Sequence, residues 1–176
     1  MKILRPGVPL AVLAVLLIST QASASEPEPH RLDQLRAIAD RAVPYHLAGG
    51  AVDQIATLDP FQCTLNPSVV HPRTSSRGES VGAKPYTECE AGTPTIISQS
   101  STLYIVEWAG AVYKPMATAT ATSRGVPKLT QKNVEWFCIN RNLSTFQQET
   151  KGYTVQDGRT FESAVTSRKD DIDCGY

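Results

Sequence analysis

Residues 95–108, TIISQSSTLYIVEW, and residues 111–122, AVYKPMATATAT, form two extended stretches with a break at Gly110 between them. From Ala117 to Thr122 alanine and threonine alternate, which places the alanines on one face of a strand and the threonines on the other. β-Branched and aromatic residues in such a pattern indicate strands. We therefore expect a mainly β protein with a hairpin that turns at residues 107–110.

Other strand signals follow from Phe61 to the end of the chain. Pro115 has no amide donor, so its strand should lie at a sheet edge or contain a bulge. Residues 133–140 carry apolar side chains on both sides, which predicts a strand that is buried on both faces. These short strands predict an antiparallel β-sandwich or a small barrel of about 7 to 9 strands, and we favour the sandwich.

A second hairpin is predicted around Asp157-Gly158. A three-residue loop would set Tyr153 opposite Phe161, whereas a two-residue loop would set it opposite Glu162. We expect the three-residue loop, with Gly158 in the left-handed conformation.

One short N-terminal helix is expected from about Pro29 to Val43, where apolar residues recur at helical spacing before Pro44 ends the pattern. A helix of this size cannot cover an open sheet. The open face of the sheet must therefore be covered by a second sheet, which is why we favour a sandwich.

The N-terminus has the pattern of a secretory signal peptide, with Lys2 and Arg5 ahead of an apolar run and the small residues Ala22-Ser23-Ala24 at its end. The run is too short for the roughly 30 Å of a bilayer core, so we expect cleavage after Ala24 and no membrane insertion afterwards. The predicted divisions are a signal peptide (1–24), an N-terminal tail, helix and linker (25–60) and a β domain (61–176). This pattern predicts a secreted, extracellular protein.

The charges of the chain balance, with 17 Lys and Arg against 17 Asp and Glu. Such a chain lacks the positive field that holds nucleic acid phosphates or anionic membranes, so we expect neither as a partner. An extracellular protein or a polysaccharide remains. About 150 mature residues suffice for one core.

The 4 cysteines predict two disulfides, because an even number in an exported chain forms a disulfide framework. Loop entropy does not choose among the three possible pairings. We predict Cys63 with Cys89 and Cys138 with Cys174, since each pair would then join nearby strands. No CxxC spacing occurs, so we expect no metal site.

No catalytic motif is present: GxSxG and HExxH are both absent, and His30, His46 and His71 are expected at the surface. Glu88 and Glu90 flank a cysteine at a spacing that would suit glycoside hydrolysis, although two such acids more often form a solvated strand face. We predict no catalytic residue and no cofactor.

Two weaker patterns point to ligands. Asp170, Asp171 and Asp173 could supply oxygen ligands to calcium, but they lack EF-hand spacing and are more simply a charged turn. The threonines of 117–122 could organise water for an ice or polysaccharide surface. A single row of threonines is not an array, and a solvated strand face is the ordinary interpretation.

Three aromatic residues, Tyr104, Trp108 and Tyr113, surround the predicted turn at 107–110. Aromatic rings at such a place can stack on sugar rings, and they can also cap a core. We select these three as candidate binding residues.

Four features occur together: the predicted strand Lys84–Cys89, the pair Leu103-Tyr104, Cys138 and the closing segment Ser167–Cys174. In these residues the chain resembles small, largely uncharacterised secreted proteins of actinobacteria. It implies an exported β domain with two disulfides and no known activity.

The leading functional hypothesis is therefore a non-enzymatic extracellular binding or interaction domain. The alternatives are a secreted enzyme that acts on a wall polymer and a protease inhibitor that presents the loop from Pro67 to Gly78.

Overall fold

The computed structural model describes residues 40–49, 58–77, 79–107 and 112–176. Strands predominate in this part of the chain, and all their pairings are antiparallel. The elements are β1 (Val43–Pro44), β2 (His46–Leu47), β3 (Cys63–Asn66), β4 (His71–Pro72), the 3-10 helix η1 (Thr74–Ser76), β5 (Ser80–Ala83), β6 (Tyr86–Cys89), β7 (Ile96–Glu107), β8 (Val112–Arg124), β9 (Lys128–Thr130), β10 (Val134–Phe137), β11 (Asn140–Gln156), β12 (Arg159–Thr166) and β13 (Asp170–Gly175).

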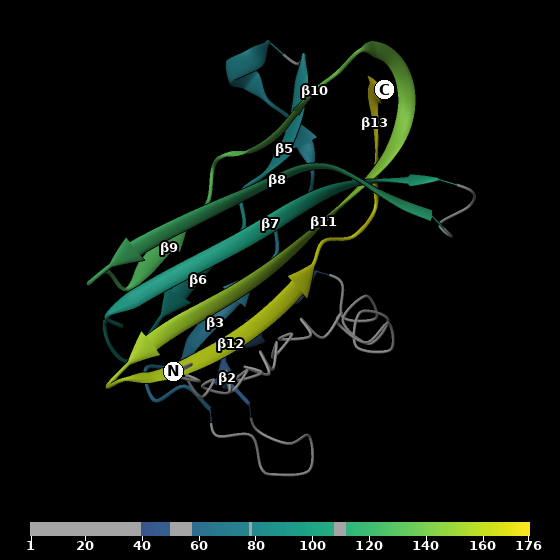
Figure 1. Ribbon diagram of the computed structural model, residues 1–176. Coiled ribbons are helices and arrows are strands. Elements are labelled where there is room, and N and C mark those ends of the chain that lie inside the picture. The colour runs from purple at the N-terminus through teal and green to yellow at the C-terminus, as the bar shows by residue number, and fades with distance from the viewer. Residues whose placement is uncertain (1–39, 50–57, 78, 108–111) are drawn as a thin grey trace, which may run out of the picture.

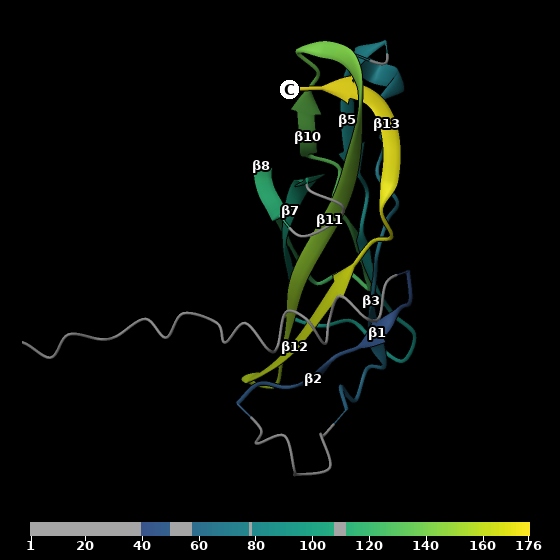
Figure 2. The same ribbon diagram turned by 90° about the vertical axis from the view of Figure 1, so that its right-hand side faces the viewer.

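The strands form three sheets. The long sheet has the order β2-β12-β11-β7-β8, and β13 joins it by pairing with the upper part of β11. A four-stranded sheet has the order β1-β3-β6-β9 and a three-stranded sheet the order β10-β5-β4. Figure 1 shows the long sheet in front of the two smaller ones, and Figure 2 shows these layers edge-on.

Two apolar clusters lie between the layers. The first joins Phe161 and Ile97 of the long sheet to Leu65 of the four-stranded sheet. The second joins Phe146 and Leu103 of the long sheet to Val81 of the three-stranded sheet. Each smaller sheet therefore covers its own half of the long sheet's inner face.

A layer of hydrogen-bonded polar side chains lies between the long sheet and the four-stranded sheet. We call it the inner polar layer and define it by five buried residues, Thr87, Gln99, Ser101, Gln131 and Thr150. The amide of Gln99 donates to Thr87 over 2.7 Å, and the hydroxyl of Ser101 donates to Gln131 over 2.7 Å. These bonds satisfy donors that would be costly to bury alone, while the Oε1 atom of Gln99 is buried without a hydrogen-bond partner in the described structure.

Both predicted disulfides are confirmed. Cys63 and Cys89 lie directly opposite each other on β3 and β6. Cys138, just before β11, is bonded to Cys174 in β13, and Asn140 of β11 pairs with Gly175. The pairing follows strand adjacency, which is the basis on which it was predicted.

The structure also confirms the central hairpin, in which β7 and β8 pair along almost their whole length. Both options for Pro115 are realised, because β8 is an edge strand and its register with β7 shifts beside that proline. The alanines of β8 are half-buried and its threonines are exposed, as the alternation predicts. The predicted turn at 107–110 lies, apart from Glu107, outside the described residues.

The second hairpin corrects our prediction. Gln156 pairs with Arg159 and Tyr153 with Glu162, so the loop has two residues. Asp157 and Gly158 both have positive φ, 47° and 73°. This is the conformation of a two-residue turn whose twist matches that of its flanking strands, and it outweighs the three-residue alternative.

Three further expectations change. The predicted helix lies mostly in residues 29–39, outside the described part of the chain; its last residues are not helical, since Asp40 has a φ of 64° and Val43 begins β1. The amide of Asp40 donates to the Thr166 carbonyl, so a contact with a distant strand replaces a helical bond. Strands also begin before Phe61, with β1 and β2. The sequence did not predict them because elements of two residues are too short to show a period.

The strand at 133–140 is buried on one side only. Val134 is fully buried, whereas Phe137 and Ile139 are 64% and 71% exposed. Val134 packs into the second apolar cluster, so Phe137, which alternates with it on β10, points away from the long sheet and lies at the surface.

Candidate functional site

The aromatic site lies on the outer face of the long sheet, which we define as the face turned away from the two smaller sheets. Tyr104 of β7 lies opposite Pro115 of β8, and Val106 lies opposite Tyr113. The bulge in β8 brings the two tyrosine rings together across the strands. Their centroids are 6.1 Å apart and their planes meet at 83°, which is an edge-to-face arrangement that aromatic pairs favour.

Polar and charged groups surround this tyrosine pair. The ammonium of Lys169 lies 5.5 Å from the Tyr113 ring centroid, in cation–π range. Thr145 of β11, which lies opposite Val106 of β7, donates a 2.6 Å hydrogen bond to Asp171. The site therefore combines aromatic faces with a cation, a hydroxyl and a carboxylate.

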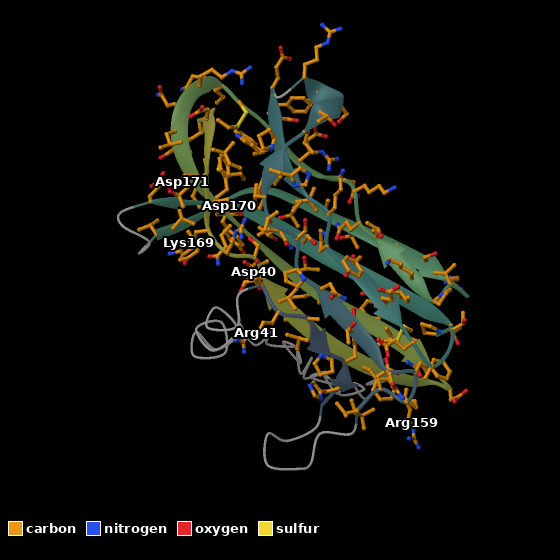
Figure 3. All side chains as sticks on the ribbon, turned by 180° about the vertical axis from the view of Figure 1, so that it is seen from behind. Asp40, Arg41, Arg159, Lys169, Asp170 and Asp171 are labelled. Carbon is orange, nitrogen blue, oxygen red and sulfur yellow. A yellow bond between two sulfur atoms is a disulfide. The ribbon has the colours of Figure 1, made fainter. Side chains whose placement is uncertain are left out.

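An ionic cluster fixes the segment that carries Lys169. The Arg168 guanidinium lies 3.0 Å from Asp170 and 3.9 Å from Asp40, and the hydrogen bond to Asp170 raises the pKa of Arg168. The Arg168 amide also donates to the Asp40 carboxylate over 3.0 Å. Figure 3 shows Asp40, Lys169, Asp170 and Asp171 gathered where the chain enters β13. Arg159, at the start of β12, lies far from them.

A groove of about 480 Å³ opens beside the tyrosine pair. It lies where β11 leaves β7 to pair with β13, and Val106 belongs to both groove and aromatic site. Tyr176 contributes one wall: its hydroxyl bonds to the Glu107 carboxylate, and Lys114 lies 4.5 Å from its ring centroid. The lining residues are Ile105, Val106, Glu107, Leu143, Ser144, Thr145 and Tyr176.

Of the three predicted binding residues, the structure thus brings Tyr104 and Tyr113 into contact. Trp108 lies outside the described residues. The sequence did not reveal Lys169 or the groove, because both depend on the return of β13 to β11, which is far away in the chain.

The carboxylate pair proposed for hydrolysis is not assembled on one strand face. Glu88 is on β6 and lies 3.2 Å from the Lys128 ammonium, whereas Glu90 follows the end of that strand. The Lys128 ammonium pairs with the Glu88 carboxylate at the surface, where solvent screens the interaction. Both glutamates are exposed, which fits the solvated interpretation.

The histidines and aspartates are also dispersed. His46 pairs with Glu162 at the edge of the long sheet, and the Nδ1 atom of His71 lies 3.1 Å from the Val69 carbonyl. The Asp170 carboxylate accepts a hydrogen bond from the Val70 amide, while the Asp171 carboxylate accepts one from the Thr145 hydroxyl. In the described residues no three His, Cys, Asp or Glu side chains converge in a way that could hold a metal ion. His30 lies outside those residues.

The threonine row of β8 has a partner that the sequence analysis did not identify. Thr118 faces Thr102 of β7 at 3.1 Å between hydroxyl oxygens, and Thr122 faces Ser98 at 2.9 Å. The signal was present as alternating hydroxyl residues in 98–102. Only the register of the hairpin shows that the two rows coincide.

No protein-family model, curated protein or solved structure matches this chain. The site is therefore interpreted from its own geometry.

Proposed function

We propose that this protein is a secreted, non-enzymatic binding domain that holds an extracellular protein or polysaccharide at its aromatic site. The observation that carries the proposal is the contact between Tyr104 and Tyr113 on the outer face, next to Lys169 and an open groove. Aromatic rings that combine an apolar face with a polar tip are common anchors in binding surfaces.

Several features support export. Two disulfides fit an oxidising compartment, and residues 1–24 have the signal-peptide pattern. Within the described residues no helix is long and apolar enough to cross a bilayer. We also propose a relation to the small secreted actinobacterial proteins, on the residues given above.

We further infer that the scaffold is a β-sandwich. The apolar clusters between the long sheet and the two smaller sheets support this inference. Such a scaffold presents one broad sheet face to solvent on rigid strands, which suits a binding surface.

The experiment begins with the chain from Ser25, screened against wall polymers, extracellular proteins and proteases with both binding and turnover recorded. Trp108→Ala and Tyr113→Ala should each weaken the ligand found by about tenfold, the loss expected for one stacking aromatic. His71→Ala and Glu88→Gln serve as matched controls away from the site and should leave affinity unchanged. Circular dichroism establishes that every variant is folded.

Two results would overturn the proposal. Hydrolysis of a polymer that is abolished by Glu88→Gln, while Trp108→Ala leaves binding intact, would establish the wall-polymer enzyme. Inhibition of a protease that is lost on mutation of exposed Arg77, in the 67–78 loop, would establish the inhibitor. Arg77 has a φ of 53° directly after η1, so this part of the loop is folded into a tight turn.

A further inference from the structure

The outer face of β7 and β8 carries two rows of hydroxyl groups in register. The pairs that face each other across the strands are Ser98 with Thr122, Ser100 with Thr120 and Thr102 with Thr118. The first and last pairs are hydrogen-bonded, while Ser100 and Thr120 are exposed between them. The row that looked single in the sequence is therefore a two-strand array.

The residues behind this array turn most of its hydroxyl groups toward solvent. Ala117 and Ala119 pack against the second apolar cluster, so the threonines of β8 point away from the core. Each hydroxyl can donate one hydrogen bond and accept others. Five of the six residues are exposed or half-buried, whereas Ser98 is only 4% exposed. A ligand could therefore approach along β8 and along β7 from Ser100 onward.

Aromatic rings lie at both ends of the array. Tyr104 and Tyr113 form one end, next to Thr102 and Thr118. At the other end Tyr153 of β11 lies opposite Ser98 and is 41% exposed. The six-residue step from Ser98 to Tyr104 corresponds to roughly 20 Å along a strand.

The neighbouring charges compensate each other. On β11, beside the array, the Lys151 ammonium lies 3.6 Å from the Glu149 carboxylate. This pair leaves little local field for a charged polymer to bind. The charges beside the hydroxyl rows therefore suit a neutral ligand, and Lys169 adds a cation only at the Tyr113 end.

We propose that the outer face binds an extended, uncharged polysaccharide chain that runs along β7 and β8. Sugar rings stack on the tyrosines at the two ends, and their hydroxyl groups exchange hydrogen bonds with the serine and threonine rows between them. A protein partner would instead favour a desolvated apolar centre, whereas here the centre is polar and the aromatic residues are at the ends. The inference rests on the proposed function, because Tyr104 and Tyr113 form one end of this surface.

The test measures affinity by calorimetry for neutral gluco- and chito-oligosaccharides from the disaccharide to the octasaccharide. Affinity should rise with length until a ligand reaches from Tyr113 to Tyr153. Tyr153→Ala should remove this gain for the longest ligand, by about tenfold, and leave the disaccharide unaffected. The double substitution Ser100→Ala with Thr120→Val should weaken long ligands by a similar factor. Thr74→Val, an exposed threonine in η1, is the matched control and should change nothing.

The outcomes separate this inference from the proposed function. Length-independent binding that requires Tyr113 but tolerates the Tyr153 and Ser100/Thr120 variants overturns the extended site and keeps the binding domain. Binding of a protein through Tyr113, with no oligosaccharide bound, also overturns the extended site and keeps the binding domain. Oligosaccharide binding that ignores Tyr113 and Trp108 overturns the proposed aromatic site and, with it, the extended site. Ice-growth inhibition lost in Thr120→Val, with no oligosaccharide bound, replaces the polysaccharide with ice.

Discussion

The two faces of β7 carry similar side chains and use them in opposite ways. On the inner face Gln99 and Ser101 are buried and bonded to other protein groups. On the outer face Ser100 is exposed and Thr102 is half-buried, and both can reach solvent. Ser98 is an exception on the outer face, since it is only 4% exposed and bonds to Thr122. The comparison shows that burial, and not the residue type, decides whether a hydroxyl stabilises the fold or remains available to a ligand.

The inner polar layer also specifies the register of the long sheet. A slip of one residue would turn Gln99 and Ser101 outward and carry Ser98 and Ser100 into the core without partners. Tyr45 extends the layer, since its buried hydroxyl bonds to Thr87 over 2.7 Å and burial raises the pKa of its phenol. It lies between β1 and β2, where the chain passes from the four-stranded sheet to the long one.

The largest expected effect comes from crowding the inner face. A Cβ atom at Gly152 would lie 2.2 Å from the Tyr45 hydroxyl oxygen, so Gly152→Ala must displace the ring or break its hydrogen bond. We expect a loss of about 3 kcal/mol in the free energy of unfolding, measured by urea denaturation. On the outer face, Ser100→Ala should change it by less than about 0.5 kcal/mol.

A double substitution tests the cause of that loss. Tyr45→Phe removes the atom that would clash, and the next Tyr45 atom is 3.1 Å from the added carbon. The double variant should therefore be more stable than Gly152→Ala alone. Equal stability would show that the hydroxyl group is not the obstacle.

A smaller effect is expected at the edge of the long sheet, where two side-chain amides bond to carbonyls of β8. Buried Gln131 donates to the Ala119 carbonyl over 2.7 Å and exposed Asn133 to the Thr120 carbonyl over 3.0 Å. Gln131→Leu should lower the free energy of unfolding by about 2 kcal/mol, because it leaves buried polar groups without hydrogen-bond partners. In Asn133→Ala water replaces the lost amide, so the loss should be below about 0.5 kcal/mol. Equal losses in thermal denaturation would mean that burial does not matter here.

A pH-dependent effect comes from a carboxylate on the three-stranded sheet. Hydrogen bonds from Ser80 and Ser76, followed by the charge of Arg73, lower the pKa of Glu135 below its usual 4.5. Ionised Glu135 thus stabilises the fold at pH values above the usual pKa of 4.5. This contribution is lost as the pH falls through the lower pKa that Glu135 has in the folded state. Melting temperatures should fall less on acidification in Glu135→Gln than in the parent. Parallel curves would contradict this assignment.

Sequence periodicity was sufficient for the central hairpin. The alternation within residues 95–108 and 111–122 predicted β7 and β8, and strand adjacency predicted both disulfides. The longest strand, β11, was not predicted over its full length. The two-residue strands β1 and β2 could not be found, because a period needs several residues to appear. The Asp157-Gly158 turn was found, but its length depended on a positive φ at both residues.

The candidate site was predicted only in part, for a related reason. Local sequence placed Tyr104 and Tyr113 around one hairpin and found the threonine row. The contact with Lys169 and the pairing of Ser98 with Thr122 depend on strand order and on register. These are long-range properties that no local pattern contains.

The smallest expected effect lies on the outer face, and it separates binding from stability. Thr120 is exposed, so Thr120→Val exchanges a solvated hydroxyl for a methyl group of similar shape in a residue that suits strands equally well. We expect the free energy of unfolding to change by less than about 0.5 kcal/mol, measured beside Thr150→Val on the inner face. Thr150 is fully buried and bonds to Ser101, so the same chemical change should cost about 1 to 3 kcal/mol there. If both variants lose the same stability, the hydroxyl array is part of the folded core and the contrast between the two faces fails.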